Sequence, residues 1–339
     1  MIINATHIGS KIDGIGRFSL VIAKHFLNKY EVIINKNAIK HFSKSDQQKL
    51  TVISSSISPD YGFIGHLKRL LFTNTLKGDI LNLSQLEVSF FNKNQIIIVH
   101  DLIPLLFPKY HKKQYLFFKY ILPFVLKHKT KQIVTVSHHT KTLLKKYYNI
   151  ENVKVIYNGI QIPPHHNYKK ENYILYVGRN SPTKNIDRLI KSFINLKQNQ
   201  KFKEYKLYLV GVDENYTRDD IISLGYVEDE KLDILYKKAK IFFFPSLYEG
   251  FGYPVIEAMA RNTAVITSKN SSLYEICQDS ALYIDPYDIN DMTNKLEYLL
   301  LNDEVRTDLQ KRGQKNVLRF DINNTLKEYD KLLSFKGYK

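Results

Sequence analysis

The sequence predicts an α/β protein made of two domains, each built on a parallel sheet. Short apolar segments with the length of buried strands alternate with helical segments along the whole chain, as in sheets covered by helices. The order strand, glycine-containing loop, helix opens the chain and begins again at Tyr173. A length of 339 residues suits two domains better than one. We therefore expect two parallel sheets that face each other across a cleft, with ligands at the carboxyl ends of the strands.

The composition fits a cytoplasmic globular protein. Apolar residues make up 44% of the chain, enough for a substantial core. The single cysteine, Cys277, allows no internal disulfide and no cysteine metal cluster, as expected in a reducing compartment. No run approaches the roughly 18 apolar residues that span a bilayer. The N-terminal segment does not resemble a signal peptide.

The net charge of +17 is the strongest compositional bias. It permits nucleic acid, an anionic membrane surface or anionic substrates as partners. The alternative is that dispersed lysines simply form a solvated surface, since Lys, Asn and Ile are abundant everywhere. No nucleic-acid-binding motif is present, and the aromatic residues form no stacking platform, so we expect no nucleic-acid partner.

The first 30 residues predict a strand (1–5), a loop (9–16) and a helix (17–27). Gly14 and Gly16 lie beside the expected helix start, where the backbone could approach a phosphate, although a structural turn is an equal alternative. Arg17 is the side chain of this loop most able to meet an anion.

Residues 30–81 are poorly informative beyond two strand-like pieces, 31–35 and 50–54. The segment 95–101 (QIIIVHD) predicts a buried strand that ends in His100 and Asp101, again at a carboxyl end. The near-neutral pKa of histidine would allow proton transfer here. The alternative is a histidine that is satisfied by a backbone partner.

The segment 108–131 is rich in lysine, tyrosine and phenylalanine, and Pro123 is expected to break its helix. A basic aromatic helix can lie on an anionic membrane. It can equally be a core helix with a lysine-covered outer face, and the two interpretations are compatible. A strand at 132–137, a helix from His138 and a strand at 153–160 complete the first domain, 1–160.

The segment 161–172, which contains Pro163-Pro164, is the expected interdomain linker. The second domain, 173–319, begins with a strand and a loop that carries Arg179 and Lys184. Two cations at the carboxyl end of a strand can converge on one diphosphate, whereas the alternative is two solvated surface charges. Residues 290–319 are expected to be helical, and a final helix within 320–339 is expected to return to the first domain.

The most informative stretch is 239–262. A buried strand (241–244) precedes a glycine-containing turn and a helix that begins at Pro254. Glu249 lies in the turn and Glu257 in the expected first helical turn, where helix stabilisation is the simpler role. Carboxylates accept hydrogen bonds from sugar hydroxyls, and a helix start offers N–H groups to phosphate or sugar oxygens. This combination outlines a nucleotide-sugar pocket.

The segment SLYEGFGYPVIEAMA resembles the E-x7-E segment of family 4 retaining glycosyltransferases, which have the GT-B fold of two Rossmann-like domains. It departs from the family only at Tyr253, where an aliphatic residue is common, and at Asn262, where glycine is usual. Five further segments are similar to the family: the glycine loop before Arg17, His100-Asp101, the GR-x4-KN segment 178–185, the loop 225–227 and the turn 271–275. The resemblance covers nearly the whole chain.

The resemblance implies transfer of a hexose from a nucleotide diphosphate sugar to a hydroxyl, with retention. Arg179, Lys184 and the helix start would stabilise the diphosphate, and Glu249 the sugar. The other implied roles are donor contacts by Gly14 and Gly16, base contacts by Gly225, Tyr226 and Val227, sugar contacts by His100 and by the N–H groups of Phe251, Gly252 and Tyr253, ribose contacts by Glu257, and acceptor-side positions for Arg17 and Asp101. No D-x-D metal motif is present, so we expect metal-independent catalysis without a cofactor.

The sequence is compatible with more than one kind of acceptor. The basic aromatic segment favours a lipid-linked glycan of bacterial surface polysaccharide (O-antigen or capsule), processed at the inner face of the plasma membrane. A soluble sugar acceptor is the nearer alternative. A non-catalytic basic binder is the more distant one, but a protein that had lost catalysis should also have lost Glu249, Glu257, Arg179 or Lys184.

Overall fold

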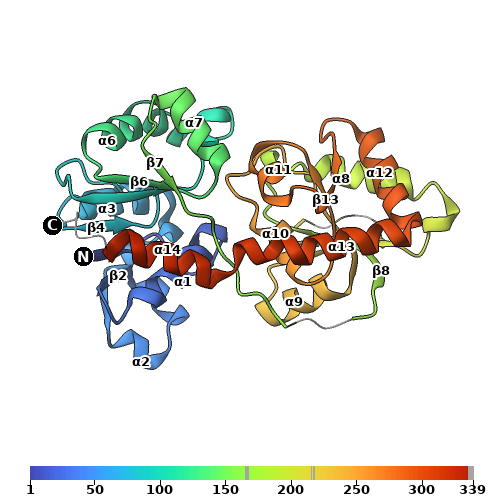
Figure 1. Cartoon of the computed structure of the whole chain (residues 1–339), viewed down its shortest axis with the longest axis horizontal. Coiled ribbons are helices and arrows are strands. Elements are labelled where there is room, and N and C mark those ends of the chain that lie inside the picture. Colours follow the sequence, from blue (N-terminus) through green and yellow to red (C-terminus); the bar gives the residue numbers. More distant parts are fainter. Residues whose placement is uncertain (165–167, 215, 217, 335–339) are drawn as a thin grey trace. The chain divides into compact units, whose positions relative to one another are not determined.

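The computed structural model describes residues 1–164, 168–214, 216 and 218–334. The chain forms two compact units (Figure 1). Unit 1 contains residues 1–159 together with the C-terminal residues from Asn323, and unit 2 contains Ile160–Ile322.

Unit 1 is built on a seven-stranded sheet in the order β3-β2-β1-β4-β5-β6-β7, with every pair parallel. Its strands are β1 (Ile2–Asn4), β2 (Glu31–Asn35), β3 (Leu50–Ile53), β4 (Ile80–Asn82), β5 (Gln95–Val99), β6 (Gln132–Thr135) and β7 (Val153–Val155). All five residues of β5 are buried, as expected for a strand covered on both faces. Strand β4 was not predicted, because three residues carry too little pattern to be recognised.

The helices of unit 1 are α1 (Gly14–Phe26), α2 (Lys44–Gln47), α3 (Gly62–Thr73), α4 (Ile103–Leu106), α5 (Lys112–Leu116), α6 (Leu122–His128), α7 (His138–Tyr148) and α14 (Ile322–Ser334), with the short turns η1 (Lys36–His41), η2 (Ser55–Ile57) and η3 (Pro59–Tyr61) and the π-helical segment η4 (Phe117–Ile121). The expected break at Pro123 is absent. Pro123 lies in the first turn of α6, directly after η4, where the widened π turn accommodates the missing N–H. Helix α14 is held on α1 by Asp330, which contacts His25 at 2.9 Å and Lys29 at 2.7 Å.

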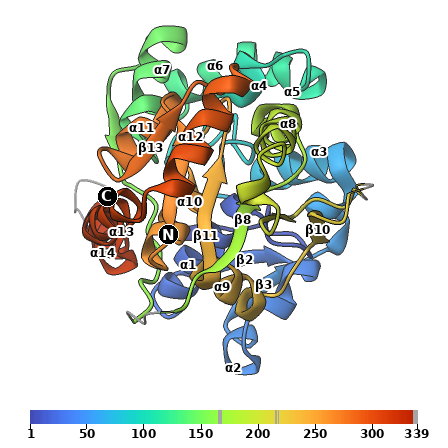
Figure 2. The ribbon, with the colours of Figure 1, turned by 90° about the vertical axis from the view of Figure 1, so that its right-hand side faces the viewer.

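Unit 2 is built on a six-stranded parallel sheet in the order β10-β9-β8-β11-β12-β13. Its strands are β8 (Glu171–Val177), β9 (Lys206–Val210), β10 (Ile221–Gly225), β11 (Ala239–Phe244), β12 (Ala264–Ser268) and β13 (Ala281–Ile284). Strands β8 and β11 are neighbours in the middle of this sheet (Figure 2). Their aromatic residues pack in the core, with Tyr176, Phe242 and Phe244 stacked at centroid distances of 5.8–6.0 Å.

The helices of unit 2 are α8 (Ile186–Leu196), α9 (Asp229–Lys238), α10 (Tyr253–Ala260), α11 (Ser271–Cys277), α12 (Ile289–Leu301) and α13 (Asp303–Val317), with the turns η5 (Pro182–Lys184), η6 (Gln200–Phe202) and η7 (Leu318–Phe320). The segment 290–319 is helical as predicted, but it consists of two helices, α12 and α13, followed by η7. Asn302 leaves the helical conformation and its side chain donates to the Tyr298 carbonyl at 2.7 Å, so α12 ends and α13 begins there.

The predicted α/β class with two parallel sheets is confirmed. Within the residues that the structure describes, no helix is long and apolar enough to cross a membrane.

Candidate functional site

Two loops at the carboxyl edge of the unit 2 sheet bring a cation and a carboxylate together. The loop after β8 carries Lys184 and the loop after β11 carries Glu249, and these strands are adjacent. Lys184 Nζ lies 2.5 Å from Glu249 Oε1, and the side chains are only 21% and 11% exposed. Lys184 Nζ also lies 5.1 Å from the ring centre of Phe244, which holds the ammonium by a cation–π contact. The sequence analysis expected Lys184 and Glu249 to bind the same nucleotide-sugar donor, but it did not predict their ion pair.

Backbone and side-chain hydrogen bonds fix the loop after β8 against the loop after β11. Leu247 N donates to the Thr183 carbonyl at 2.7 Å, and the Ser246 hydroxyl donates to the same carbonyl at 3.0 Å. The buried Asn185 adopts a left-handed conformation (φ 61°), and its amide donates to the Pro245 carbonyl at 3.1 Å. Lys184 is therefore placed by contacts that lie about sixty residues away in sequence.

Glu249 is held from helix α11. Its N–H donates to the Ser271 hydroxyl at 3.0 Å. The Ser272 hydroxyl lies within 3.0 Å of both the Glu249 carbonyl and the Phe251 carbonyl. Gly252 has φ 106°, and a Cβ there would lie 2.9 Å from Leu273. The loop 249–252 thus requires both the serine pair and the glycine.

Glu257 lies in the second turn of α10, not in the first, because the helix begins at Tyr253. Its Oε2 accepts a hydrogen bond from the Tyr236 hydroxyl of α9 at 3.0 Å. The carboxylate is thus oriented by a side chain rather than by the helix dipole, and Tyr236 was not predicted.

Arg179 is exposed and follows the end of β8 by two residues. Burial raises the pKa of the nearby Tyr176 phenol well above its usual value, the Glu249 charge adds to this rise, and the Arg179 charge opposes it. Both charged groups are therefore within electrostatic reach of one phenol.

The ends of β8, β9 and β10 meet through their backbones. Gly211 N donates to the Gly225 carbonyl at 2.7 Å, and Gly178 N donates to the Val210 carbonyl at 2.9 Å. Gly211 has φ 81°, and a Cβ there would lie 2.9 Å from the Gly178 carbonyl oxygen. Beyond this contact Tyr226 is 61% exposed and Val227 is buried.

His100 of unit 1 is buried at the carboxyl end of β5. Its Nε2 lies 2.8 Å from the Leu83 carbonyl, and its backbone N–H donates to Gln85 Oε1 at 3.1 Å. Burial lowers the pKa of His100 to about 4, so the ring is neutral at pH 7. A carbonyl only accepts, so the proton is on Nε2 and Nδ1 is the acceptor. The alternative that a backbone partner satisfies this histidine therefore applies to Nε2.

The remaining unit 1 candidates lie at the same edge of the sheet. Helix α1 begins at Gly14, so Gly14 and Gly16 are its first and third residues and not part of a preceding loop. Asp13 Oδ1 accepts from Gly16 N at 2.9 Å and occupies the amide that a phosphate would need. Arg17 is partly exposed on the first turn. Asp101 Oδ1 accepts from Ile103 N at 2.9 Å.

Among the residues that the structure describes, no group of three His, Cys, Asp or Glu side chains is arranged to hold a metal ion.

The architecture and site define an enzyme class. All-parallel sheets with charged side chains gathered at the carboxyl edge are the arrangement in which open α/β enzymes bind their ligands. Residues 159–316 match the family model described as glycosyl transferases group 1. The chain is 34% identical over 250 residues to the O-antigen chain mannosyltransferase RfbU of Salmonella typhimurium, a match that covers 68% of this chain and 67% of RfbU. The chain belongs to this family of glycosyltransferases.

Further relatives and solved structures are consistent with this family. O-antigen chain mannosyltransferase B of Escherichia coli is 34% identical over 166 residues, which cover 45% of this chain and 43% of that protein. The crystal structure of HepE from Anabaena in complex with UDP and glucose matches with a TM-score of 0.77 at 17% identity, over 98% of this chain and 99% of that one. WaaG, a glycosyltransferase involved in lipopolysaccharide biosynthesis, matches with a TM-score of 0.74 at 13% identity, over 99% and 100%. These likenesses confirm the predicted GT-B fold of this glycosyltransferase.

Proposed function

We propose that the protein transfers a hexose, with mannose as the first candidate, from a nucleotide diphosphate sugar to a hydroxyl of a lipid-linked glycan, with retention at the anomeric carbon. The Lys184–Glu249 pair carries the proposal, because it brings a group suited to the diphosphate and a group suited to the sugar to one point. Mannose is favoured by the names of the relatives RfbU and mannosyltransferase B.

The diphosphate would bind at Lys184 and Arg179, near the N–H groups at the start of α10. Cleavage of the glycosidic bond leaves negative charge on the diphosphate, and fixed cations stabilise that charge in the transition state. Glu249 neutralises Lys184 through their ion pair. A bound phosphate would compete for the lysine and release Glu249 toward the sugar. Because these cations can take the part of a metal ion, we propose metal-independent transfer.

The sugar and nucleoside would be held on both sides of the diphosphate. The N–H groups of Phe251, Gly252 and Tyr253 and the Glu249 carboxylate would bind sugar hydroxyls. The ribose would meet Glu257, which Tyr236 already orients. The base would lie against the backbone of 225–227, where the Gly211–Gly225 hydrogen bond shapes the edge.

In unit 1 His100 would accept a hydrogen bond from the transferred sugar through Nδ1. Its lowered pKa makes it a poor proton donor at neutral pH, so orientation of the sugar is the role that fits. Gly14 would contact the donor through its backbone, whereas Gly16 would do so only if its N–H exchanged Asp13 for the donor. Arg17 and Asp101 would face the acceptor.

A basic apolar surface on unit 1 supports a lipid-linked acceptor. One face of the segment α5-η4-α6 is core, with Phe117, Phe118 and Leu122 buried. Its outer face exposes large apolar side chains, as does α3, and His66 of α3 packs edge-on against Phe117 at 5.8 Å between ring centres. The exposed apolar residues of this surface are Phe63, Ile64, Leu67, Leu71, Leu116, Tyr120 and Phe124. With neighbouring lysines such as Lys113, this surface suits an anionic bilayer at the cytoplasmic face of the plasma membrane.

Two experiments test the proposed function. In a thermal-shift screen with GDP, UDP, dTDP and ADP sugars, one donor should raise the melting temperature, because a ligand that binds only the folded state stabilises it. Hydrolysis or transfer of that donor should be lost in Glu249→Ala and in Arg179→Ala and should persist in EDTA. A protein that binds none of these donors would exclude the function.

Membrane binding is tested separately. The protein should float with phosphatidylglycerol vesicles at low salt and less with pure phosphatidylcholine vesicles. The triple variant Leu116→Ser, Tyr120→Ser and Phe124→Ser should lose flotation, whereas Tyr287→Ser, at a 62% exposed position of unit 2, should not. Absence of flotation would favour a soluble acceptor.

A further inference from the structure

The chain segment that holds His100 is itself anchored by buried charges. This segment, Leu83–Glu87, directly follows β4. At one end it grips His100 through the Leu83 carbonyl and the Gln85 side chain, which also donates to the Asp101 carbonyl at 3.4 Å. At its other end lies Glu87, whose side chain is fully buried.

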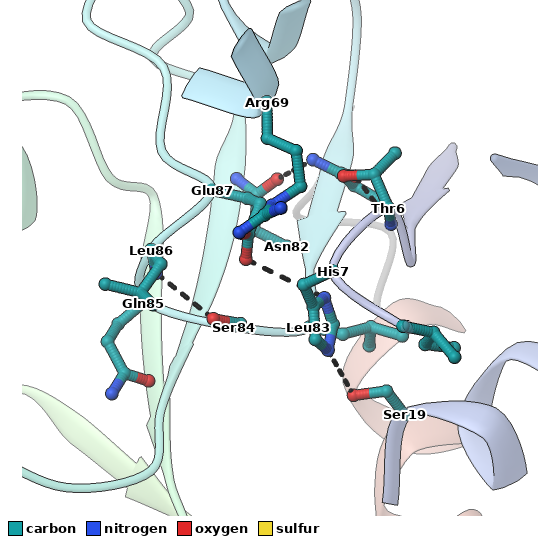
Figure 3. Close-up of polar contacts among 12 residues, drawn as sticks. Thr6, His7, Ser19, Arg69, Asn82, Leu83, Ser84, Gln85, Leu86 and Glu87 are labelled. Carbon is teal, nitrogen blue, oxygen red and sulfur yellow. Dashed lines mark hydrogen bonds and ion pairs between the residues drawn. The ribbon is translucent and has the colours of Figure 1, made fainter. Parts of the chain in front are cut away.

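Glu87 is paired with Arg69 of α3. Arg69 Nε donates to Glu87 Oε1 at 2.8 Å (Figure 3). Arg69 Nη1 donates to the Ile57 carbonyl at 2.7 Å. The exposed fractions of the two side chains are 4% and 0%. Burial alone would raise the pKa of Glu87, but the charge and hydrogen bond of Arg69, with smaller contributions from His7 and His66, hold that pKa below its usual value. The pair is therefore ionised.

His7 joins the pair to the neighbouring strand and helix. Its Nε2 lies 2.7 Å from the Ser19 hydroxyl of α1, and its Nδ1 lies 3.7 Å from Glu87 Oε2 (Figure 3). Burial lowers the pKa of His7, although the Glu87 charge opposes this. Leu83 N donates to the Asn4 carbonyl of β1 at 3.3 Å. The segment 83–87 is thus fixed from β1, α1 and α3 at once.

Stability alone is a weak explanation for this arrangement. A buried ion pair is costly to desolvate, and apolar residues of similar volume often replace one at no loss of stability. Unlike apolar residues, the ion pair fixes an orientation, because the hydrogen bonds of the guanidinium hold the Glu87 carboxylate in one position. That carboxylate lies four residues from the carbonyl that sets the tautomer of His100.

We propose that Arg69 and Glu87 are positioning residues: they fix segment 83–87 so that Leu83 and Gln85 hold His100 in one tautomer and one orientation. This inference rests on the proposed function, in which His100 orients the transferred sugar. Small displacements of a positioning group can cost about 100-fold in rate.

The test uses the full chain and the double variant Arg69→Met/Glu87→Leu, which removes both charges and keeps the volume. The single variant Glu87→Gln keeps an oxygen that can accept from Arg69. The matched control is Lys145→Met/Glu151→Gln, an exposed ion pair of the same unit with an N–O distance of 3.1 Å. Each protein is compared by melting temperature, by kcat and donor KM, by affinity for the nucleoside diphosphate, and by the imidazole signals of His100 in ¹⁵N-histidine spectra, assigned with His100→Gln.

We expect the double variant to fold and its kcat to be about 10- to 100-fold lower than that of wild type. Its Kd for the nucleoside diphosphate should stay within about 2-fold of the wild-type value, and its His100 signal should be shifted or broadened. Glu87→Gln should lose less in kcat, and the control should match wild type. A folded double variant with wild-type kcat and an unchanged His100 signal would overturn the proposal. If neither Arg69/Glu87 variant folds, the pair is structural and the proposal also fails. The His100 signal does not depend on activity, so a wild-type protein that binds no donor would remove the proposed function alone.

Discussion

Replacing Glu249 by glutamine should tighten the binding of a nucleoside diphosphate while it abolishes sugar transfer. The Glu249 carboxylate lies 2.5 Å from Lys184 Nζ, the cation proposed for the diphosphate. A phosphate that approaches Lys184 must displace this carboxylate and is repelled by it. The glutamine side chain has nearly the same shape but carries no charge, so both costs fall.

The magnitude follows from the exposure of the pair. Two unit charges about 4 Å apart interact by ~4 kcal/mol at an effective dielectric constant of ~20 and by ~1 kcal/mol in water. Exposed fractions of 21% and 11% place this site between these limits. Loss of the Glu249 charge should therefore favour the diphosphate by roughly 1–2 kcal/mol, or about 5- to 30-fold in Kd.

Titration calorimetry with UDP and GDP measures this effect without the sugar, which Glu249 is also proposed to bind. Lys184→Met should weaken binding. Glu249→Gln should tighten binding less in the Lys184→Met background than in wild type, because the competition for the lysine is then absent and only the repulsion between carboxylate and phosphate is removed. The cycle of four proteins isolates this coupling. If Glu249→Gln binds the nucleotide more weakly than wild type, or if the two substitutions are additive, the carboxylate does not compete for Lys184 and the reasoning is wrong.

Three further predictions concern the edges of the two sheets. Gly211→Ala should lower the melting temperature and weaken nucleotide binding, because a Cβ there would lie 2.9 Å from the Gly178 carbonyl oxygen. The control Gly78→Ala, at a similar φ with open space around it, should cost only the backbone strain of ~1 kcal/mol. Equal losses of stability in the two variants would contradict this prediction. Tyr236→Phe removes the hydrogen bond that orients Glu257 and should raise the donor KM by about 5-fold with little change in kcat; an unchanged KM would show that Glu257 needs no support. His100 has a pKa of about 4 in the folded protein and about 6.5 in the unfolded chain, so its contribution to stability is complete above pH 6.5 and is lost as the pH falls toward 4. Chemical unfolding should show that the free energy of unfolding decreases by about 3 kcal/mol over this pH range and by less in His100→Gln. An equal decrease in that variant would refute the assignment.

The sequence alone determined the fold class and the residues of the site that follow local rules. Alternating apolar strands and helices suffice to predict parallel sheets, because burial on both faces leaves a recognisable run such as Ile241–Phe244. The glycines around Glu249 predicted a turn between the strand and the helix, and Gly252 in this turn does have a left-handed backbone. The short strands β4 and β10 and the division at Asn302 were missed, since each depends on tertiary pairing or on a single side chain.

Tertiary structure decided which of these residues meet. Lys184 and Glu249 are 65 positions apart, and their contact depends on β8 lying beside β11, which no local pattern specifies. In the same way the tautomer of His100 depends on a carbonyl 17 positions away, and the charge of Glu87 on an arginine of another helix. The physical reason is that a parallel sheet collects the carboxyl ends of all its strands at one edge, whereas strand order is set by packing of the whole unit.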